Sequence, residues 1–240
     1  MAGLVINGAM TLGPAPSGSS GPTTMAAYLT SIGKDSFYGG YRAGLNMYST
    51  ADNSSPVTDG QNVRRWVANW TTGSWAAEFT QGSSPKRPVY GASRNGLPGI
   101  YGDASGWYMS LNSTTALNRT YTVLMSTWAT FATNGNIYSH SNNQIQLRAP
   151  SALANDALTF AAAVGGSSVS KAVETTPVSG TTAVIRAGIV SSGTTFYNTA
   201  PVILANSGDT NHTSSTIHEI WLIGAALTPR EISTALQYLL

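Results

Sequence analysis

The acidic residues of this chain bear on whether it could hydrolyse a sugar bond. A glycoside hydrolase needs one carboxyl group as a general acid and a second carboxylate across the scissile bond. The chain has four glutamates, and no two of them lie within a few residues of each other: Glu78, Glu174, Glu219 and Glu231. The aspartates occupy turn-like contexts, where aspartate is common for conformational reasons. The sequence therefore lacks a carboxylate pair on one strand, and we expect no enzymatic activity.

The histidines are the next candidates for chemistry. His212 and the adjacent pair His218 and Glu219 invite a metal or acid-base interpretation, but their spacing fits no zinc signature. The absence of cysteine excludes a thiolate zinc site, a cysteine nucleophile and a disulfide scaffold. We interpret His212 as a loop residue and His218 as a residue on a strand face. Glu219 is then a buried partner of a backbone group or an arginine rather than a catalyst.

Aromatic side chains could form a flat platform on which sugar rings stack. The chain has six tryptophans and eleven tyrosines. The candidate glycan-binding residues are those near predicted loops: Trp70, Trp75, Tyr101, Trp107 and Tyr108. Trp66, Trp128 and Trp221 alternate with apolar neighbours and are interpreted as core residues.

Composition narrows the range of partners. Charged residues make up 9% of the chain, against about 25% in an average soluble domain. Such a composition is typical of a β-rich protein with many turns, and also of a protein in a dense assembly or outside the cell. The net charge is +2, and the basic residues are scattered. We therefore expect no nucleic-acid partner, and no apolar run is long enough to predict a membrane span.

The end of the chain carries the clearest structural signals. Residues 217–223 are apolar on both faces, which predicts a strand that is covered on both sides. Thr228 is a good helix N-cap, Pro229 suits the first helical position, and Glu231 completes a capping box. The helix that follows has one apolar stripe, formed by Ile232, Ala235, Leu236 and Leu239. We expect this helix to pack on the rest of the molecule.

The remainder of the chain reads as strands and turns. Residues 121–128 are rich in β-formers and predict a buried strand. Further strands are predicted at 45–48, 137–140, 144–148, 158–164, 169–173, 183–190 and 196–204. Short strands at about ten-residue spacing are typical of an all-β sandwich.

Residues 1–44 differ from this pattern. Residues 13–22 are dominated by Gly, Pro and Ser, which favours a linker, and 23–32 have the apolar spacing of a short helix. The segment has too few apolar residues for a core of its own, so we expect it to lean on the main domain or on a partner. The candidate attachment residues are Leu4, Val5, Ile6, Met10 and Leu12.

Two parts of the chain resemble a known family. Thr58-Asp59-Gly60, followed by Val63 and Trp66, and later Arg87-Pro88-Val89-Tyr90, are similar to the opening of laminin-G-like domains. The closing strand with its glutamate, and the helix that begins Leu-Thr-Pro-Arg-Glu, resemble the end of the same concanavalin A-like fold. The resemblance covers roughly residues 45–111 and 217–240. It implies an all-β jelly-roll sandwich over 45–240, with a short C-terminal helix after an extended N-terminal leader.

The resemblance also implies a candidate ion. Laminin-G-like domains sometimes hold calcium at the rim of the sandwich, and hard cations take oxygen ligands. The candidate calcium ligands are Asp52, Asp59, Asp103 and Asp209. No contiguous ligand loop is present, and no other cofactor is expected.

The stretch Ile-Asn-Gly-Ala-Met-Thr-Leu at residues 6–12, with the later Tyr-Gly-Gly at 38–40, makes residues 1–44 similar to the leaders of bacteriophage tail and virion proteins. This similarity implies a non-enzymatic structural protein of a tailed phage particle, either a tail or fibre component or a capsid decoration. Its location would be the virion, its partners other virion proteins through the leader, and its exposed end would contact host glycan. We expect a homo-oligomer. The alternatives are a bacterial carbohydrate-binding module or adhesin domain and, third, a glycoside hydrolase or lyase.

Overall fold

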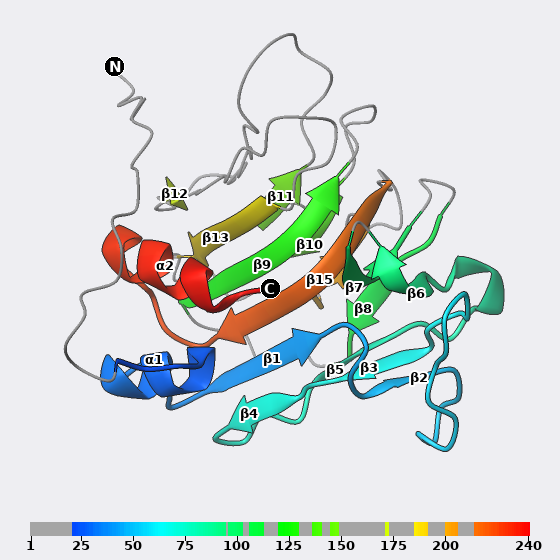
Figure 1. Cartoon of the computed structure of the whole chain (residues 1–240), viewed down its shortest axis with the longest axis horizontal. Helices are drawn as coiled ribbons and strands as arrows, with labels where there is room; N and C mark the ends of the chain where they lie inside the picture. The colour runs from blue at the N-terminus through cyan, green and yellow to red at the C-terminus, as the bar shows by residue number, and fades with distance from the viewer. Residues whose placement is uncertain are drawn as a thin grey trace, which may run out of the picture.

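The computed structural model describes most of the chain outside its first twenty residues and several internal segments. The described residues are 21–94, 96–102, 106–112, 120–129, 136–140, 145–148, 171–172, 185–191, 200–205 and 214–240. Within them the structure is mostly β, with two antiparallel sheets that form a sandwich (Figure 1). The predicted β-sandwich with a short C-terminal helix is thereby confirmed.

The larger sheet has eight strands in the described part of the chain. They are β1 (Tyr38–Arg42), β4 (Trp70–Thr72), β6 (Val89–Arg94), β7 (Leu97–Tyr101), β9 (Tyr121–Ala129), β12 (Lys171–Ala172), β13 (Ile185–Ser191) and β15 (Ser215–Ile223). Their order is β12-β13-β9-β15-β1-β4, and the hairpin of β6 and β7 joins through β7, which pairs with β15. Strand β15 therefore has β9 along one side and, on the other, first β7 and then β1.

The smaller sheet has seven described strands in the order β11-β10-β14-β8-β5-β3-β2. They are β2 (Met47–Tyr48), β3 (Arg65–Val67), β5 (Glu78–Thr80), β8 (Met109–Leu111), β10 (Asn136–His140), β11 (Ile145–Arg148) and β14 (Val202–Ile203). The predicted strands at 137–140 and 144–148 form the antiparallel pair β10 and β11. A short 3-10 helix, η1 (Ser84–Lys86), follows β5.

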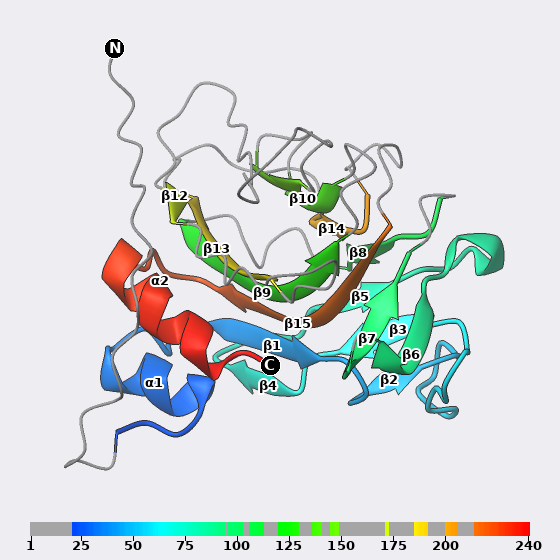
Figure 2. The same cartoon turned by 45° about the horizontal axis from the view of Figure 1, so that its top comes forward.

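The main core lies between the two sheets, which Figure 2 shows as separate layers. Tyr41 of β1 packs edge-on against Trp66 of β3 and Phe79 of β5, with ring centroids 5.7 and 5.0 Å apart. From β9 and β15, the inward residues Val123 and Ile220 are fully or almost fully buried in the same cluster. Contacts between aromatic rings thus join the two sheets near β1.

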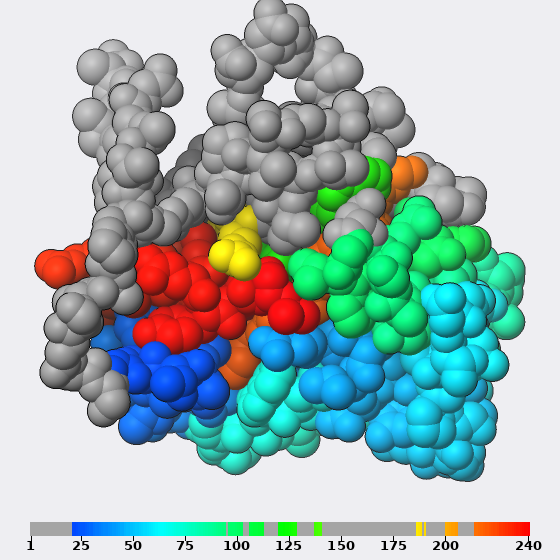
Figure 3. All heavy atoms as spheres, viewed as in Figure 1, coloured from blue at the N-terminus to red at the C-terminus, as the bar shows by residue number. Residues whose placement is uncertain are grey.

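A second core lies on the opposite face of the larger sheet, which we call the outer face. Helix α1 (Met25–Ser31), helix α2 (Pro229–Ala235) and η3 (Leu236–Tyr238) cover one end of this face. The space-filling view shows α1 and α2 in contact with each other (Figure 3). The Tyr28 hydroxyl donates to the carbonyl of Glu231 at 3.0 Å, and its ring stacks on Tyr238.

The C-terminal helix forms as its sequence predicts. The Thr228 hydroxyl accepts a hydrogen bond from the N–H of Glu231, and the Glu231 carboxylate accepts one from the N–H of Thr228 at 2.6 Å. The apolar stripe that includes Ile232 and Leu236 is buried against Leu124 and Trp221 of the larger sheet. The capping box and the packing of the helix are both confirmed.

Residues 21–44 contribute elements to the sandwich. The sequence predicts a leader that ends at residue 44, whereas β1 lies between β15 and β4 within the larger sheet. Two glycines make this possible, because a Cβ on Gly39 would lie 2.2 Å from the Trp75 ring and one on Gly40 would lie 2.7 Å from the Trp221 ring. The five candidate attachment residues, Leu4 to Leu12, lie outside the described residues. Among the described helices, none is long and apolar enough to cross a membrane.

Candidate functional site

The register of three neighbouring strands places two aromatic side chains on the outer face. Thr216 of β15 pairs with Trp128 of β9 on one side and with Tyr101 of β7 on the other. All three point away from the main core, because their neighbours Thr127, Ile217 and Ile100 face inward. Adjacent strands lie about 4.8 Å apart, so the backbones of Trp128 and Tyr101 are separated by about 10 Å.

Two further side chains extend this row. The Trp107 ring lies 6.3 Å from the Tyr101 ring at an angle of 55°, and the Arg94 guanidinium lies 4.2 Å above the Tyr101 ring. Tyr101, Trp107 and Trp128 are half-buried, whereas Arg94 is exposed. We call Tyr101, Trp107 and Trp128 the aromatic patch. It lies at the end of the outer face that α2 leaves uncovered (Figure 1).

A pair of glycines lies beside the patch on the outer face of the sheet. Gly91 of β6 pairs directly with Gly99 of β7, and both lie on the outer face. A Cβ on Gly99 would lie 2.2 Å from the Thr216 methyl group, so only glycine lets β7 approach β15 closely here. A Cβ on Gly91 would meet Arg94 at 3.4 Å and Tyr101 at 3.6 Å. Arg94 therefore lies across the glycine pair as well as over Tyr101.

His218 holds β7 against β15 beside the patch. Its register on β15 shifts at an irregularity between Ile217 and Glu219, and its ring is fully buried next to Gly99. The Nδ1 atom lies 2.8 Å from the carbonyl oxygen of Pro98, so Nδ1 carries the proton and donates to it. Burial lowers the pKa of His218, an effect that the Pro98 carbonyl partly opposes. The neutral imidazole has its Nε2 buried without a hydrogen-bond partner.

Glu219 lies on the same face as the patch and is fully engaged. Its Oε2 atom accepts hydrogen bonds from Arg42 Nε and Nη2 at 3.1 and 2.9 Å, and from the N–H of Leu240 at 3.1 Å. Its Oε1 atom accepts one from Trp221 Nε1 at 2.6 Å. The interpretation of Glu219 as a buried partner of an arginine and a backbone group is confirmed. These contacts use both carboxylate oxygens and direct neither of them toward the aromatic patch.

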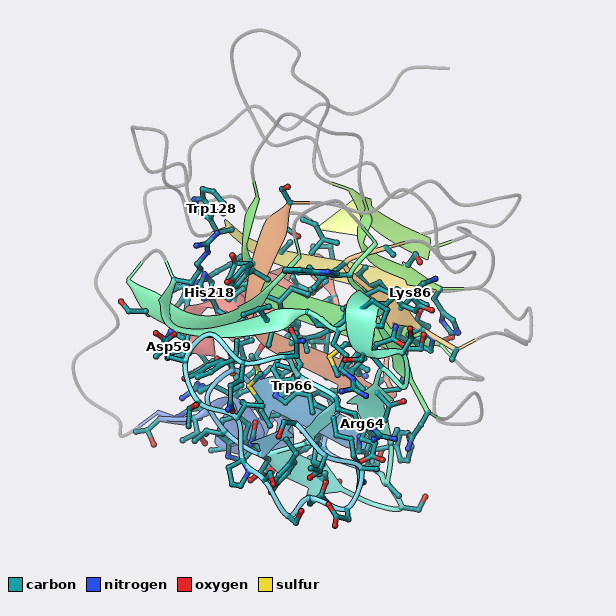
Figure 4. The ribbon with its side chains drawn as sticks, turned by 90° about the vertical axis from the view of Figure 1, so that its right-hand side faces the viewer. Asp59, Arg64, Trp66, Lys86, Trp128 and His218 are labelled. Carbon is teal, nitrogen blue, oxygen red and sulfur yellow. The ribbon has the colours of Figure 1, made fainter. Side chains whose placement is uncertain are left out.

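The structure separates the five candidate glycan-binding residues into groups. Tyr101 and Trp107 lie together in the aromatic patch. Trp70 stacks on Trp221 with centroids 5.3 Å apart and belongs to the core under the helices. Trp75 is buried in the main core, where its indole N–H donates to the Tyr41 hydroxyl at 3.0 Å, so its ring offers no platform. Tyr108 lies beneath Lys86, which Figure 4 shows on the opposite side of the molecule from Trp128 and His218.

The sequence predicts a different position for one member of the patch, Trp128. Trp128 alternates with apolar residues and is therefore interpreted as core, yet it is half-exposed on the outer face. Alternation along β9 shows that its even-numbered residues share a face, but it does not show that the helices cover only the end that carries Leu124. The pairing of β9, β15 and β7 supplies that information, and no local signal in the sequence does.

The candidate calcium ligands do not form a cluster in the described residues. Asp52 is exposed in its own turn, where hydrogen bonds from Ser54 and Thr50 lower its pKa to about 2. Asp59 accepts a hydrogen bond from the N–H of Ala92 at 2.7 Å. Asp103 and Asp209 lie outside the described residues. Within the part of the chain that the structure describes, no group of three or more His, Asp or Glu side chains could hold a metal ion.

The patch offers a ligand two kinds of contact. The faces of half-exposed tryptophan and tyrosine rings present flat apolar surface, on which the C–H groups of a pyranose ring can stack. The exposed Arg94 guanidinium, held over Tyr101, supplies hydrogen-bond donors at the edge of that surface. This combination suits a ligand with both an apolar face and hydroxyl groups.

Comparisons with known proteins give no match. No protein-family model, no curated protein and no solved structure matches this chain.

Proposed function

We propose that this chain is a non-enzymatic structural protein of a tailed bacteriophage particle, whose β-sandwich contacts glycan through the aromatic patch. Within the particle it serves as a tail or fibre component or as a capsid decoration. The observation that carries the glycan contact is the row of Trp128, Thr216 and Tyr101 across β9, β15 and β7, with Trp107 beside it. Tyr101 and Trp128 are on strands, so their rings are held in fixed positions.

The placement in a particle is supported by the sequence. Residues 1–44 resemble phage virion leaders, and the low charge suits a dense assembly. The resemblance of residues 45–111 and 217–240 to concanavalin A-like jelly rolls supports a lectin-like role for the sandwich, by analogy of fold. A free carbohydrate-binding module or adhesin domain would use the same patch. The two differ in that only a virion protein is found in purified, nuclease-treated particles.

A glycoside hydrolase or lyase would need catalytic groups near the bound sugar. Glu219 is the described glutamate on the outer face beside the patch, and its oxygens bind Arg42, Trp221 and Leu240. Glu78 is paired with Arg65 on the smaller sheet. We expect incubation with bacterial polysaccharides to release no reducing ends. Cleavage that is lost in Glu219→Gln would overturn the non-enzymatic assignment.

The glycan contact is tested by binding to an array of neutral glycans. Each patch residue is replaced in turn, as Tyr101→Ala, Trp107→Ala and Trp128→Ala. Removing one stacked ring costs about 0.5–1.5 kcal/mol beyond the lost area, which amounts to about tenfold weaker binding when both losses are counted. Circular dichroism of each variant verifies that the sandwich remains folded.

Tyr108→Ala is the matched control, because Tyr108 is a half-buried tyrosine beneath a cation, as Tyr101 is. Its ring faces Lys86 rather than Tyr101, so its removal should leave glycan binding unchanged. Binding that survives the loss of Trp107 and of Trp128, or that depends on Tyr108 instead, would show that the aromatic patch is not the glycan site.

A further inference from the structure

The main chain of Arg64 and the side chain of Arg87 both bind the segment that follows β5. The N–H of Gln81 donates to the carbonyl of Arg64 at 2.9 Å, and Arg87 Nε donates to the carbonyl of Gln81 at 3.1 Å. Arg87 Nη2 also donates to the carbonyl of Gly82 at 2.9 Å. Two main-chain bonds therefore fix the Arg87 guanidinium, and they leave three of its five N–H donors available.

The charges of these two arginines are not compensated. The ion pairs in the described part of the chain are Arg42 with Glu219 and Arg65 with Glu78. The pKa of Arg87 is lowered by burial and by the positive charge of Arg64. Both side chains are only partly exposed, so water screens their repulsion incompletely. An arrangement of this kind costs free energy until an anion lies between the charges.

A third basic residue, Lys86, belongs to the same segment. It ends η1 just before Arg87, and its ammonium lies 5.6 Å from the Tyr108 ring. The N–H of Tyr108 donates to the carbonyl of Lys86 at 3.0 Å, which ties this segment to the start of β8. Figure 4 shows Lys86 and Arg64 on the same side of the molecule, away from Trp128 and His218. The segment that carries Lys86 and Arg87 thus lies away from Trp128 and His218.

We propose that Arg64 and Arg87 form a binding site for an oxoanion group such as a phosphate, a sulfate or a carboxylate. The planar guanidinium fork matches the paired oxygens of these groups, and the main-chain bonds of Arg87 prepare its orientation before the anion arrives. The site is independent of the proposed glycan contact, because no residue is shared between the two surfaces.

The test is a titration of the full-length protein with inorganic phosphate, sulfate and acetate, each compared with sodium chloride at equal ionic strength. Calorimetry measures binding, and thermal unfolding measures the stabilisation that a bound anion confers. We expect at least one oxoanion to raise the Tm more than chloride does. Comparison of the three titrations shows whether the site prefers phosphate, sulfate or carboxylate.

Arg64→Gln is the decisive variant, because the Arg64 side chain makes no hydrogen bond to the described main chain that would stabilise the fold. Losing one charged hydrogen-bond donor group should weaken anion binding about tenfold. Without anion, the same variant should have an equal or higher Tm, since the repulsion of Arg87 is removed. Arg94→Gln, which removes an exposed arginine on the outer face, is the control and should bind the anion as wild type does. Equal effects of all salts, or undiminished binding by Arg64→Gln, would overturn the proposal.

Discussion

Replacing Glu219 by glutamine tests how the outer face is held together. The Glu219 side chain is fully buried, and its two oxygens accept four hydrogen bonds, from Arg42, Trp221 and Leu240. Glutamine has the same shape, but its amide nitrogen is a donor and cannot accept. Whichever way the amide is turned, its N–H₂ group faces donors that have lost their acceptor.

The cost follows from the burial of each partner. Removing one member of a buried ion pair costs about 3–5 kcal/mol, because the other charge is left uncompensated. The Arg42 side chain is 31% exposed, so water partly restores its solvation. Water cannot solvate the indole N–H of Trp221 in the same way, since the residue is only 2% exposed. We therefore expect Glu219→Gln to lower the free energy of unfolding by about 3 kcal/mol, near the lower end of that range.

Urea unfolding at neutral pH measures the loss, with the slope checked for two-state behaviour. Glu78→Gln is the matched control, because Glu78 also pairs with an arginine, but both side chains of that pair are partly exposed. Its loss should be smaller, because the Glu78 side chain is 13% exposed, whereas that of Glu219 is 0% exposed, so water can partly replace the contacts that Glu78 loses. If Glu219→Gln costs no more than Glu78→Gln, then the Glu219 contacts do not stabilise the outer face as argued.

Three further predictions follow from the described elements. Leu236→Ala should lower the free energy of unfolding by about 2–5 kcal/mol because it leaves a cavity under η3. Thr228→Ala should lower it by about 1 kcal/mol by removing the helix cap. Denaturant unfolding that ranks the two variants in the reverse order would contradict the packing of this helix. The pKa of His218 is lowered from 6.5 in the folded state, so the unfolded chain binds the proton at higher pH and stability should fall as the pH drops below about 6.5. His218→Gln should have a flatter pH dependence of its unfolding free energy between about pH 7.5 and 5, and an unchanged dependence would refute the assignment. Deleting residues 1–20 should keep the sandwich folded but abolish oligomer formation and incorporation into particles, whereas deleting 1–40 removes α1 and part of β1 and should unfold the protein. Normal assembly of the 1–20 deletion, measured by light scattering and by its recovery in particles, would exclude a role of this segment in attachment.

The parts of the fold that the sequence predicts best are those with local chemical signals. The capping box of Thr228 and Glu231 and the apolar stripe of the following helix are local, and the structure forms both. Strand β9 and helix α1 also follow from short patterns of β-formers and helical spacing. In these segments, burial and backbone hydrogen bonding depend on residues that lie within a few positions of each other.

The candidate site depends on pairing between distant segments, which one sequence does not specify. Tyr101 and Trp128 lie together only because β7 and β9 both pair with β15. Trp75 follows a predicted turn and is expected on a loop, but the glycine at position 39 admits its ring into the core. Arg64 and Arg65 are neighbours in sequence, yet Arg65 pairs with Glu78, while the charge of Arg64 contributes to lowering the pKa of Arg87. Such differences arise from tertiary register, which local propensity cannot predict.

The most direct test of the glycan contact is an NMR titration with a glycan that binds in the array. It follows the indole N–H signals of the six tryptophans. Trp66 and Trp75 are buried in the main core and serve as internal controls. The account predicts that the Trp107 and Trp128 signals shift together in a saturable manner, while the Trp66 and Trp75 signals stay in place. A saturating glycan that leaves Trp107 and Trp128 unmoved would contradict the central claim that this surface binds carbohydrate.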